Sequence, residues 1–119
     1  MTTTEQLGDL TVQFEDADSP VIARTDDAMD LIGNASYSGV NLVVLPVGRL
    51  DPEFFRLSSG LAGEVLQKFV TYRVRVAVVG DILAYVEASE ALRDFVWESN
   101  RGEHVWFVAD EAALREKLA

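Results

Sequence analysis

A nearly continuous apolar run at residues 41–47, Asn-Leu-Val-Val-Leu-Pro-Val, constrains the fold more than any other feature. A strand with one face in water alternates apolar and polar residues, whereas a strand covered on both faces does not. A second strand is predicted at 73–79, and an amphipathic helix over about 60–72 separates the two. Right-handed crossovers through helices join parallel strands, so we predict a mainly parallel sheet covered by helices.

The remaining segments extend this alternation. Residues 10–14 alternate like a half-buried strand, and 21–24 read as a strand after a turn at 16–20, so we predict an opening hairpin. A last strand is expected at 104–108. Helices are predicted to begin after the capping residues Thr25, Ser89 and Asp110. The predicted order is β-β-α-β-α-β-α-β-α, an α/β fold.

Length and composition indicate one domain. The chain has 119 residues, of which 49% are hydrophobic, so we expect a flexible N-terminus over 1–8 and a single domain over 9–119. The net charge is −10, from 20 acidic and 10 basic residues. Nucleic acids and anionic membranes attract basic surfaces, so neither is an expected partner.

Residue usage also argues against several kinds of chemistry. There is no cysteine and one histidine, so we expect no disulfide, no metal and no cofactor. No basic leader or membrane-length apolar run is visible, which favours a cytoplasmic protein. No catalytic triad, phosphate loop or dinucleotide fingerprint appears, so an enzymatic role stays open without being favoured.

Two serines precede the predicted helix at 60–72. The N-terminus of a helix exposes unpaired N–H groups and favours oxygen ligands and negative charge. Ser58 or Ser59 could therefore cap this helix, or one of them could be a phosphoacceptor.

The same helix carries a candidate functional face. Gly63 inside a helix costs about 1 kcal/mol relative to alanine, which suggests close packing or a nearby ligand. The face is either simply solvated or binds a partner. Its members are Gly60, Gly63, Glu64, Gln67 and Lys68.

A second candidate is a polar cluster near the helix predicted after Ser89. Its members are Asp81, Arg93, Asp94, Glu98 and Asn100. A sharper hypothesis joins Glu64 and Lys68 of one helix to Arg93 and Asp94 of the next, against the alternative of ordinary surface ion pairs. Ligands of parallel sheets bind beyond the carboxyl ends of the strands, here 45–51, 80–86 and 109–110.

The stretch Ser58-Ser59-Gly60-Leu61, between an apolar strand and an amphipathic helix, resembles the helix start of the STAS domain family. That family includes anti-sigma factor antagonists and has Asp-Ser-Ser/Thr-Gly-Leu at this point, where a partner kinase phosphorylates the first hydroxyl. The resemblance implies a STAS-like fold and makes Ser58 the phosphoacceptor. Leu57 stands in place of the Asp.

The chain is also similar, over most of its length, to a bacterial family described as domain of unknown function 4180. The run Gly-Leu-Ala-Gly-Glu-Val-Leu-Gln-Lys-Phe at 60–69 is its most specific match. Further matching pieces are 54–57, 72–73, 79–81 and 92–102. This resemblance implies no activity.

Three functional hypotheses follow. The first is a small regulatory or interaction module that binds a protein partner through the loop and helix at 58–72. The second is a small-molecule-binding or enzymatic domain with a polar cleft near Glu64, Asp81 and Arg93. The third is a non-catalytic homodimer with Phe54, Phe55 or Trp97 in its interface.

Overall fold

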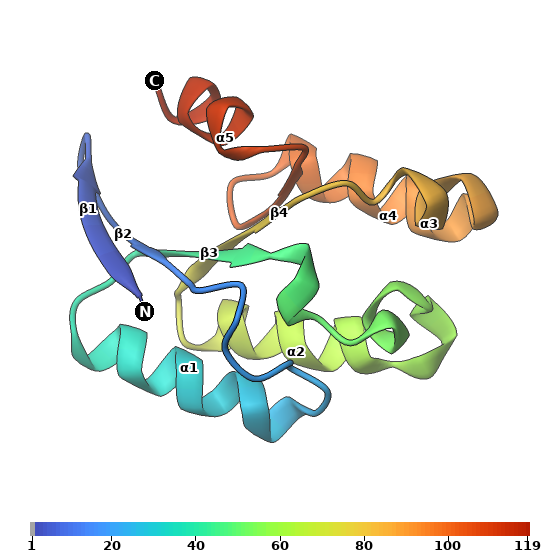
Figure 1. Ribbon diagram of the computed structural model, residues 1–119, viewed down its shortest axis with the longest axis horizontal. Coiled ribbons are helices and arrows are strands. Elements are labelled where there is room, and N and C mark those ends of the chain that lie inside the picture. Colours follow the sequence, from blue (N-terminus) through green and yellow to red (C-terminus); the bar gives the residue numbers. More distant parts are fainter. Residues whose placement is uncertain (1) are drawn as a thin grey trace.

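The computed structural model describes residues 2–119 and shows a five-stranded sheet in the order β1-β2-β3-β4-β5 (Figure 1). β1 pairs with β2 in the antiparallel sense, whereas the pairs β2–β3, β3–β4 and β4–β5 are parallel. The strands are β1 Thr3–Leu7, β2 Leu10–Phe14, β3 Leu42–Pro46, β4 Arg75–Val79 and β5 Val105–Val108. The prediction of an α/β fold with a mainly parallel sheet is confirmed.

Helices cover both faces of the sheet. Three of them, α1, α2 and α4, contribute side chains to one core, and α5 packs on the opposite face. The helices are α1 Thr25–Tyr37, α2 Leu61–Thr71, α3 Leu83–Ala88, α4 Glu90–Arg101 and α5 Glu111–Leu118. Three short 3₁₀ segments separate β3 from α2: η1 Val47–Arg49, η2 Pro52–Phe55 and η3 Leu57–Ser59.

β3 is the central strand that the apolar run predicts. Val43 and Leu45 lie in the core that α1 and α2 cover, and Leu42 and Val44 lie in the core that α5 covers. All four side chains are buried. Burying one such side chain contributes about 1.5 to 3 kcal/mol, so this strand loses its stabilisation if either layer is removed.

The predicted opening hairpin between 10–14 and 21–24 is wrong, because the hairpin forms between β1 and β2. β2 pairs with β1, which lies within the 1–8 segment expected to be flexible, and Gly8 at φ 60° begins the two-residue turn between them. Residues 21–24 contribute only a single bridge, between Ile22 and Leu50. An exposed edge strand needs no apolar pattern, which is why its polar sequence gave no strand signal. Met1, the first residue of the predicted flexible segment, lies outside the described residues.

An ion pair with α5 holds this polar strand in place. Arg115 donates to both carboxylate oxygens of Glu5, at 2.7 and 3.0 Å. These hydrogen bonds lower the pKa of Glu5 and raise the pKa of Arg115. The contact ties the N-terminal strand to the C-terminal helix across the sheet.

Two of the three predicted helix caps are confirmed. Ser89 Oγ accepts from the N–H of Leu92 at 3.1 Å, and Asp110 accepts from Ala113 at 2.8 Å. Thr25 is instead the first residue of α1. The Asp27 carboxylate accepts there from the two N–H groups of residues 23 and 24, which lowers its pKa.

The six-residue helix α3 is absent from the predicted order. None of its residues is fully buried, and six residues are too few for a helical period of apolar positions to be recognised. Asp81 starts it by accepting from the N–H of Leu83 at 2.9 Å. α3 therefore adds an element between β4 and α4.

A buried ion pair joins the exits of β2 and β3. Arg49 and Glu15 have side chains only 8% and 5% exposed, and their charged atoms lie 3.1 Å apart. The guanidinium also donates to the carbonyls of Asp16 and Pro20, at 2.8 and 2.9 Å. One side chain thus fixes the 15–20 loop against η1.

The exits of β3 and β4 also meet closely. Gly80 has φ 144°, and a Cβ placed on it would lie 2.7 Å from Cγ2 of Val47. Real Cβ atoms do not approach a carbon that closely, so only glycine fits at this crossing. The segments that follow the two strands therefore start from one tight contact.

Replacing Arg49 with methionine should lower the free energy of unfolding by about 3 to 5 kcal/mol, because Glu15 stays buried without its partner. Denaturant unfolding measures the loss. The double variant Arg49→Met/Glu15→Leu, which also removes the stranded charge, should lose less than the single one. An equal or larger loss in the double variant would contradict this account.

Replacing Gly80 with alanine should cost about 1 to 3 kcal/mol through overpacking against Val47. Gly48→Ala is the control, since a Cβ at Gly48 meets nothing within 4 Å. Its effect should stay within about 0.5 kcal/mol. Equal thermal unfolding midpoints for the two variants would show that the crossing is not tight.

Candidate functional site

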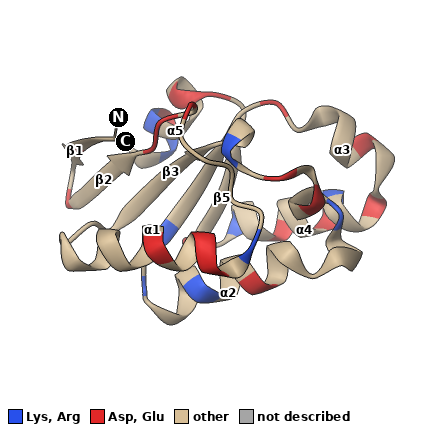
Figure 2. Ribbon diagram, turned by 60° about the horizontal axis from the view of Figure 1, so that its bottom comes forward, with Lys and Arg blue, Asp and Glu red and all other residues tan. Residues whose placement is uncertain are grey.

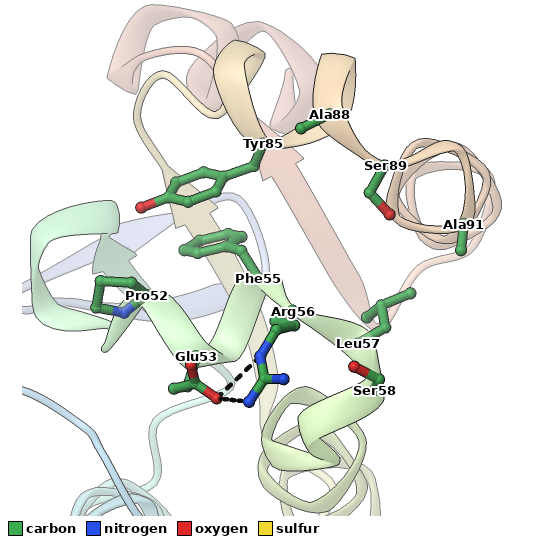
Figure 3. A pocket seen from close by; sticks show the side chains of 10 residues that line it. All are labelled: Pro52, Glu53, Phe55, Arg56, Leu57, Ser58, Tyr85, Ala88, Ser89 and Ala91. Carbon is green, nitrogen blue, oxygen red and sulfur yellow. Dashed lines mark hydrogen bonds and ion pairs between the residues drawn. The ribbon is translucent and has the colours of Figure 1, made fainter.

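A cleft of about 420 Å³ opens beyond the carboxyl ends of β3 and β4 (Figure 3). One wall is the η2–η3 segment that follows β3, and the other is α3 with the start of α4. This is the edge of the sheet where ligands of parallel α/β folds bind. The lining residues are Pro52, Glu53, Phe55, Arg56, Leu57, Ser58, Tyr85, Ala88, Ser89 and Ala91.

Two stacked aromatic rings connect the walls of the cleft. The ring centroids of Phe55 and Tyr85 lie 4.5 Å apart with an interplanar angle of 13°. Phe54 packs edge-on against Phe55 at 5.2 Å. Phe54 and Phe55 are buried within the chain, so they are not exposed for the homodimer interface hypothesised from the sequence. The stack gives the cleft a rigid apolar surface.

Local sequence explains why η2 presents Phe55 in this way. The carboxylate of Asp51 accepts from the N–H of Glu53 at 2.9 Å, and Pro52 occupies the first position of the turn, where its missing N–H costs nothing. From the sequence, ligands are expected near 45–51, 80–86 and 109–110. Tyr85 falls in the second range, although its role was not predicted.

An ion pair lies at the mouth of the cleft. Nε and Nη2 of Arg56 donate to one oxygen of Glu53, at 3.1 and 2.5 Å. These hydrogen bonds raise the pKa of Arg56. Both side chains are more than half exposed, so the pair is screened by water and contributes little to stability. It leaves a polar rim around an apolar interior.

The two serines before α2 have different surroundings. Ser59 Oγ accepts from the N–H of Leu61 at 3.2 Å and donates to the carbonyl of Glu53 at 2.7 Å. The formal cap is Gly60, whose φ of 82° suits glycine. Ser58 is exposed, lines the cleft, and has no hydrogen-bond partner among the described residues. Ser59 thus satisfies the helix start, while Ser58 stays free for solvent or ligand.

The candidate face of α2 points away from the cleft and is loosely packed. Glu64 accepts from the hydroxyl of Thr25 at 3.0 Å rather than pairing with Lys68. A Cβ at Gly63 would meet nothing within 4 Å, so the expectation of close packing there is wrong. Gln67 donates only a long 3.4 Å bond to Thr71.

The predicted polar cluster does not assemble. Arg93 lies 3.8 Å from Glu90, and Glu98 lies 3.6 Å from Arg101. Both ion pairs are formed within α4. Asp94 is exposed. α2 packs on α1, whereas α4 packs on β5 and α3. No hydrogen bond or ion pair in the described chain joins any two of Glu64, Asp81 and Arg93.

Asn100 closes the free edge of the sheet. Its side-chain oxygen accepts from the N–H of Phe107 at 2.7 Å, and its amide donates to the Phe107 carbonyl at 3.1 Å. β5 pairs only with β4, so these backbone groups would otherwise face outward. A second strand could pair with them if they were free. The residue predicted as part of a polar cluster therefore has a clear structural role.

The described residues contain neither a metal-binding cluster nor a membrane-spanning helix. Residues 2–119 contain no group of three or more His, Cys, Asp or Glu side chains arranged to hold a metal ion. Within the same range, every helix is too short or too polar to cross a bilayer.

The chain belongs to the family described as Domain of unknown function (DUF4180), whose model matches residues 8–118. No curated protein and no solved structure matches the chain. The region that the family model matches includes both walls of the cleft and Asn100.

Replacing Asn100 with alanine should lower the free energy of unfolding by about 1 to 3 kcal/mol, because two partly buried backbone groups lose their partner. The opened edge should also make the protein self-associate as its concentration rises. Chemical denaturation and sedimentation velocity measure the two effects. Gln67→Ala on exposed α2 is the control, and an Asn100 variant that behaves like it would contradict the clamp.

Proposed function

We propose that this protein is a small interaction module that holds an aromatic or aliphatic side chain of a protein partner in the cleft between η2–η3 and α3–α4. The observation that carries the proposal is the Phe55–Tyr85 stack, which gives an open cleft a preformed apolar surface. Pre-organised aromatic pockets are where interfaces concentrate their binding energy. Ser58 places the start of the predicted 58–72 binding segment at the rim of this cleft.

The shape of the cleft favours a protein partner over a small molecule. Small-molecule sites bury most of the ligand surface and combine apolar walls with convergent polar groups. Here the cleft is open, and its one acidic lining residue, Glu53, is paired with Arg56. Ser89 Oγ is already used as a helix cap. The cleft suits one or two side chains of a segment that continues outside it.

Ser58 gives the module a point of regulation. Its hydroxyl is exposed at the rim, two residues from the Arg56 guanidinium. A phosphate at Ser58 would compete with Glu53 for Arg56 and place a dianion at the mouth of an apolar cleft. We therefore propose that a negative charge at Ser58 weakens the binding of an apolar side chain.

The first test is an NMR titration of isotope-labelled protein with N-acetyl-tryptophanamide. N-acetyl-glycinamide, which has no apolar side chain, is the control. The tryptophan amide should shift the backbone signals of Arg56, Ser58, Tyr85 and Ala91, and the glycine amide should not. Ala88→Trp should abolish these shifts by filling the cleft from the exposed end of α3. Ala112→Trp on exposed α5 is the matched control and should leave them unchanged.

The second test selects displayed peptides on the wild-type protein. Peptides with aromatic or aliphatic anchors should bind, and both Ala88→Trp and Ser58→Asp should weaken them by about tenfold or more. No signal shift with the tryptophan amide, or peptides that bind the Ala88→Trp variant as well as the wild type, would overturn the proposal.

A further inference from the structure

We propose a second binding site, for a basic amphipathic helix of a protein partner, in a groove at the carboxyl ends of β4 and β5. The groove has a volume of about 240 Å³ and lies on the opposite side of α3 from the cleft described above. Its lining is mostly apolar. The members are Gly80, Asp81, Ile82, Leu83, Val86, Val96, Phe107, Val108 and Ala109.

Apolar side chains remain uncovered at this groove. Leu83, which lines it, is 58% exposed, and Trp97, which follows the lining residue Val96 on α4, is 60% exposed. The Trp97 ring is covered on one face only by the Arg101 guanidinium, 4.7 Å from its centroid. A hollow apolar surface with large exposed side chains beside it is typical of an interaction site.

One acidic residue lines the groove, and two more follow lining residues in the sequence. Asp81 lines it, and the exposed residues Glu87 and Asp110 directly follow the lining residues Val86 and Ala109. No lysine or arginine is among the lining residues. Figure 2 shows acidic positions beside α3 and near α5, and within α3 itself the acidic residue is Glu87. An occupant with an apolar face and flanking positive charges is complementary to this arrangement.

The partner cannot extend the sheet here, because Asn100 occupies the outward N–H and C=O of Phe107. Recognition must therefore use side chains. An amphipathic helix laid into a groove binds through apolar anchors spaced at i, i+3/i+4 and i+7, with polar residues at its flanks. A second copy of this chain is a poor occupant, because each copy carries a net charge of −10.

The test uses a defined peptide, a helical Leu/Lys amphipathic peptide, and its Leu/Glu counterpart with the same apolar face. The Lys peptide should bind and shift the backbone signals of Ile82, Leu83, Val96 and Ala109, with the Glu peptide at least about tenfold weaker. Raising salt from about 50 mM to about 500 mM should weaken binding, because the attraction is electrostatic in part.

Leu83→Arg should weaken the Lys peptide by about tenfold or more, and this exposed position makes unfolding of the variant an improbable explanation. Val70→Arg on α2 adds the same charge at a position 43% exposed and should change binding by less than about twofold. Equal effects of the two variants, or no preference for the Lys peptide, would overturn the proposal. Signal shifts at Arg56 and Tyr85 alone would assign the peptide to the cleft instead and would also overturn it.

Discussion

The buried ion pair between Arg49 and Glu15 is the interaction on which the segments that follow β2 and β3 depend. Two charges are removed from water, and their mutual contact, the carbonyls of Asp16 and Pro20 and the side-chain amide of Gln13, which donates to Glu15 at 2.6 Å, compensate for the lost hydration. The pair fixes η1 where β3 ends. Since η2 and η3 continue from η1, this ion pair helps to position the wall of the cleft that carries Phe55, together with the Ile22–Leu50 bridge and the contact of Val47 with Gly80.

The sequence predicted the elements whose burial pattern is strong. The apolar run at 41–47 identified β3, and Ser89 and Asp110 marked two helix starts, because caps and central strands have local physical causes. β1 and α3 were not predicted, and the predicted opening hairpin paired 10–14 with 21–24 instead of with β1. β1 is an exposed edge strand, and α3 has only six residues, none of them fully buried, so neither carries the periodic apolar signal that prediction depends on.

The cleft is not lined by Glu64, Asp81 or Arg93, the residues near which the sequence predicts a polar cleft. The rule that ligands bind beyond the carboxyl ends of parallel strands pointed to 80–86, and Tyr85 lies there. The polar cluster around Arg93 and Glu64 did not assemble, because Glu64 contacts Thr25 of α1 and Arg93 pairs with Glu90 of its own helix. Which neighbours a helix face meets depends on tertiary packing, which the sequence pattern does not give. Arg49 and Glu15 could have been noticed, since Glu15 directly follows β2 and Arg49 lies three residues after β3, at the same edge of the sheet.

The short helix α3 separates the cleft from the groove, and this has an energetic consequence. Tyr85 and Ala88 line one side, and Leu83 and Val86 line the other. The helix is held by the half-buried residues Tyr85 and Val86, which pack against the core, so moving it changes contacts on both sides. A ligand that moves α3 changes the shape of both sites at once. The two affinities are then thermodynamically linked, and the coupling is equal in both directions.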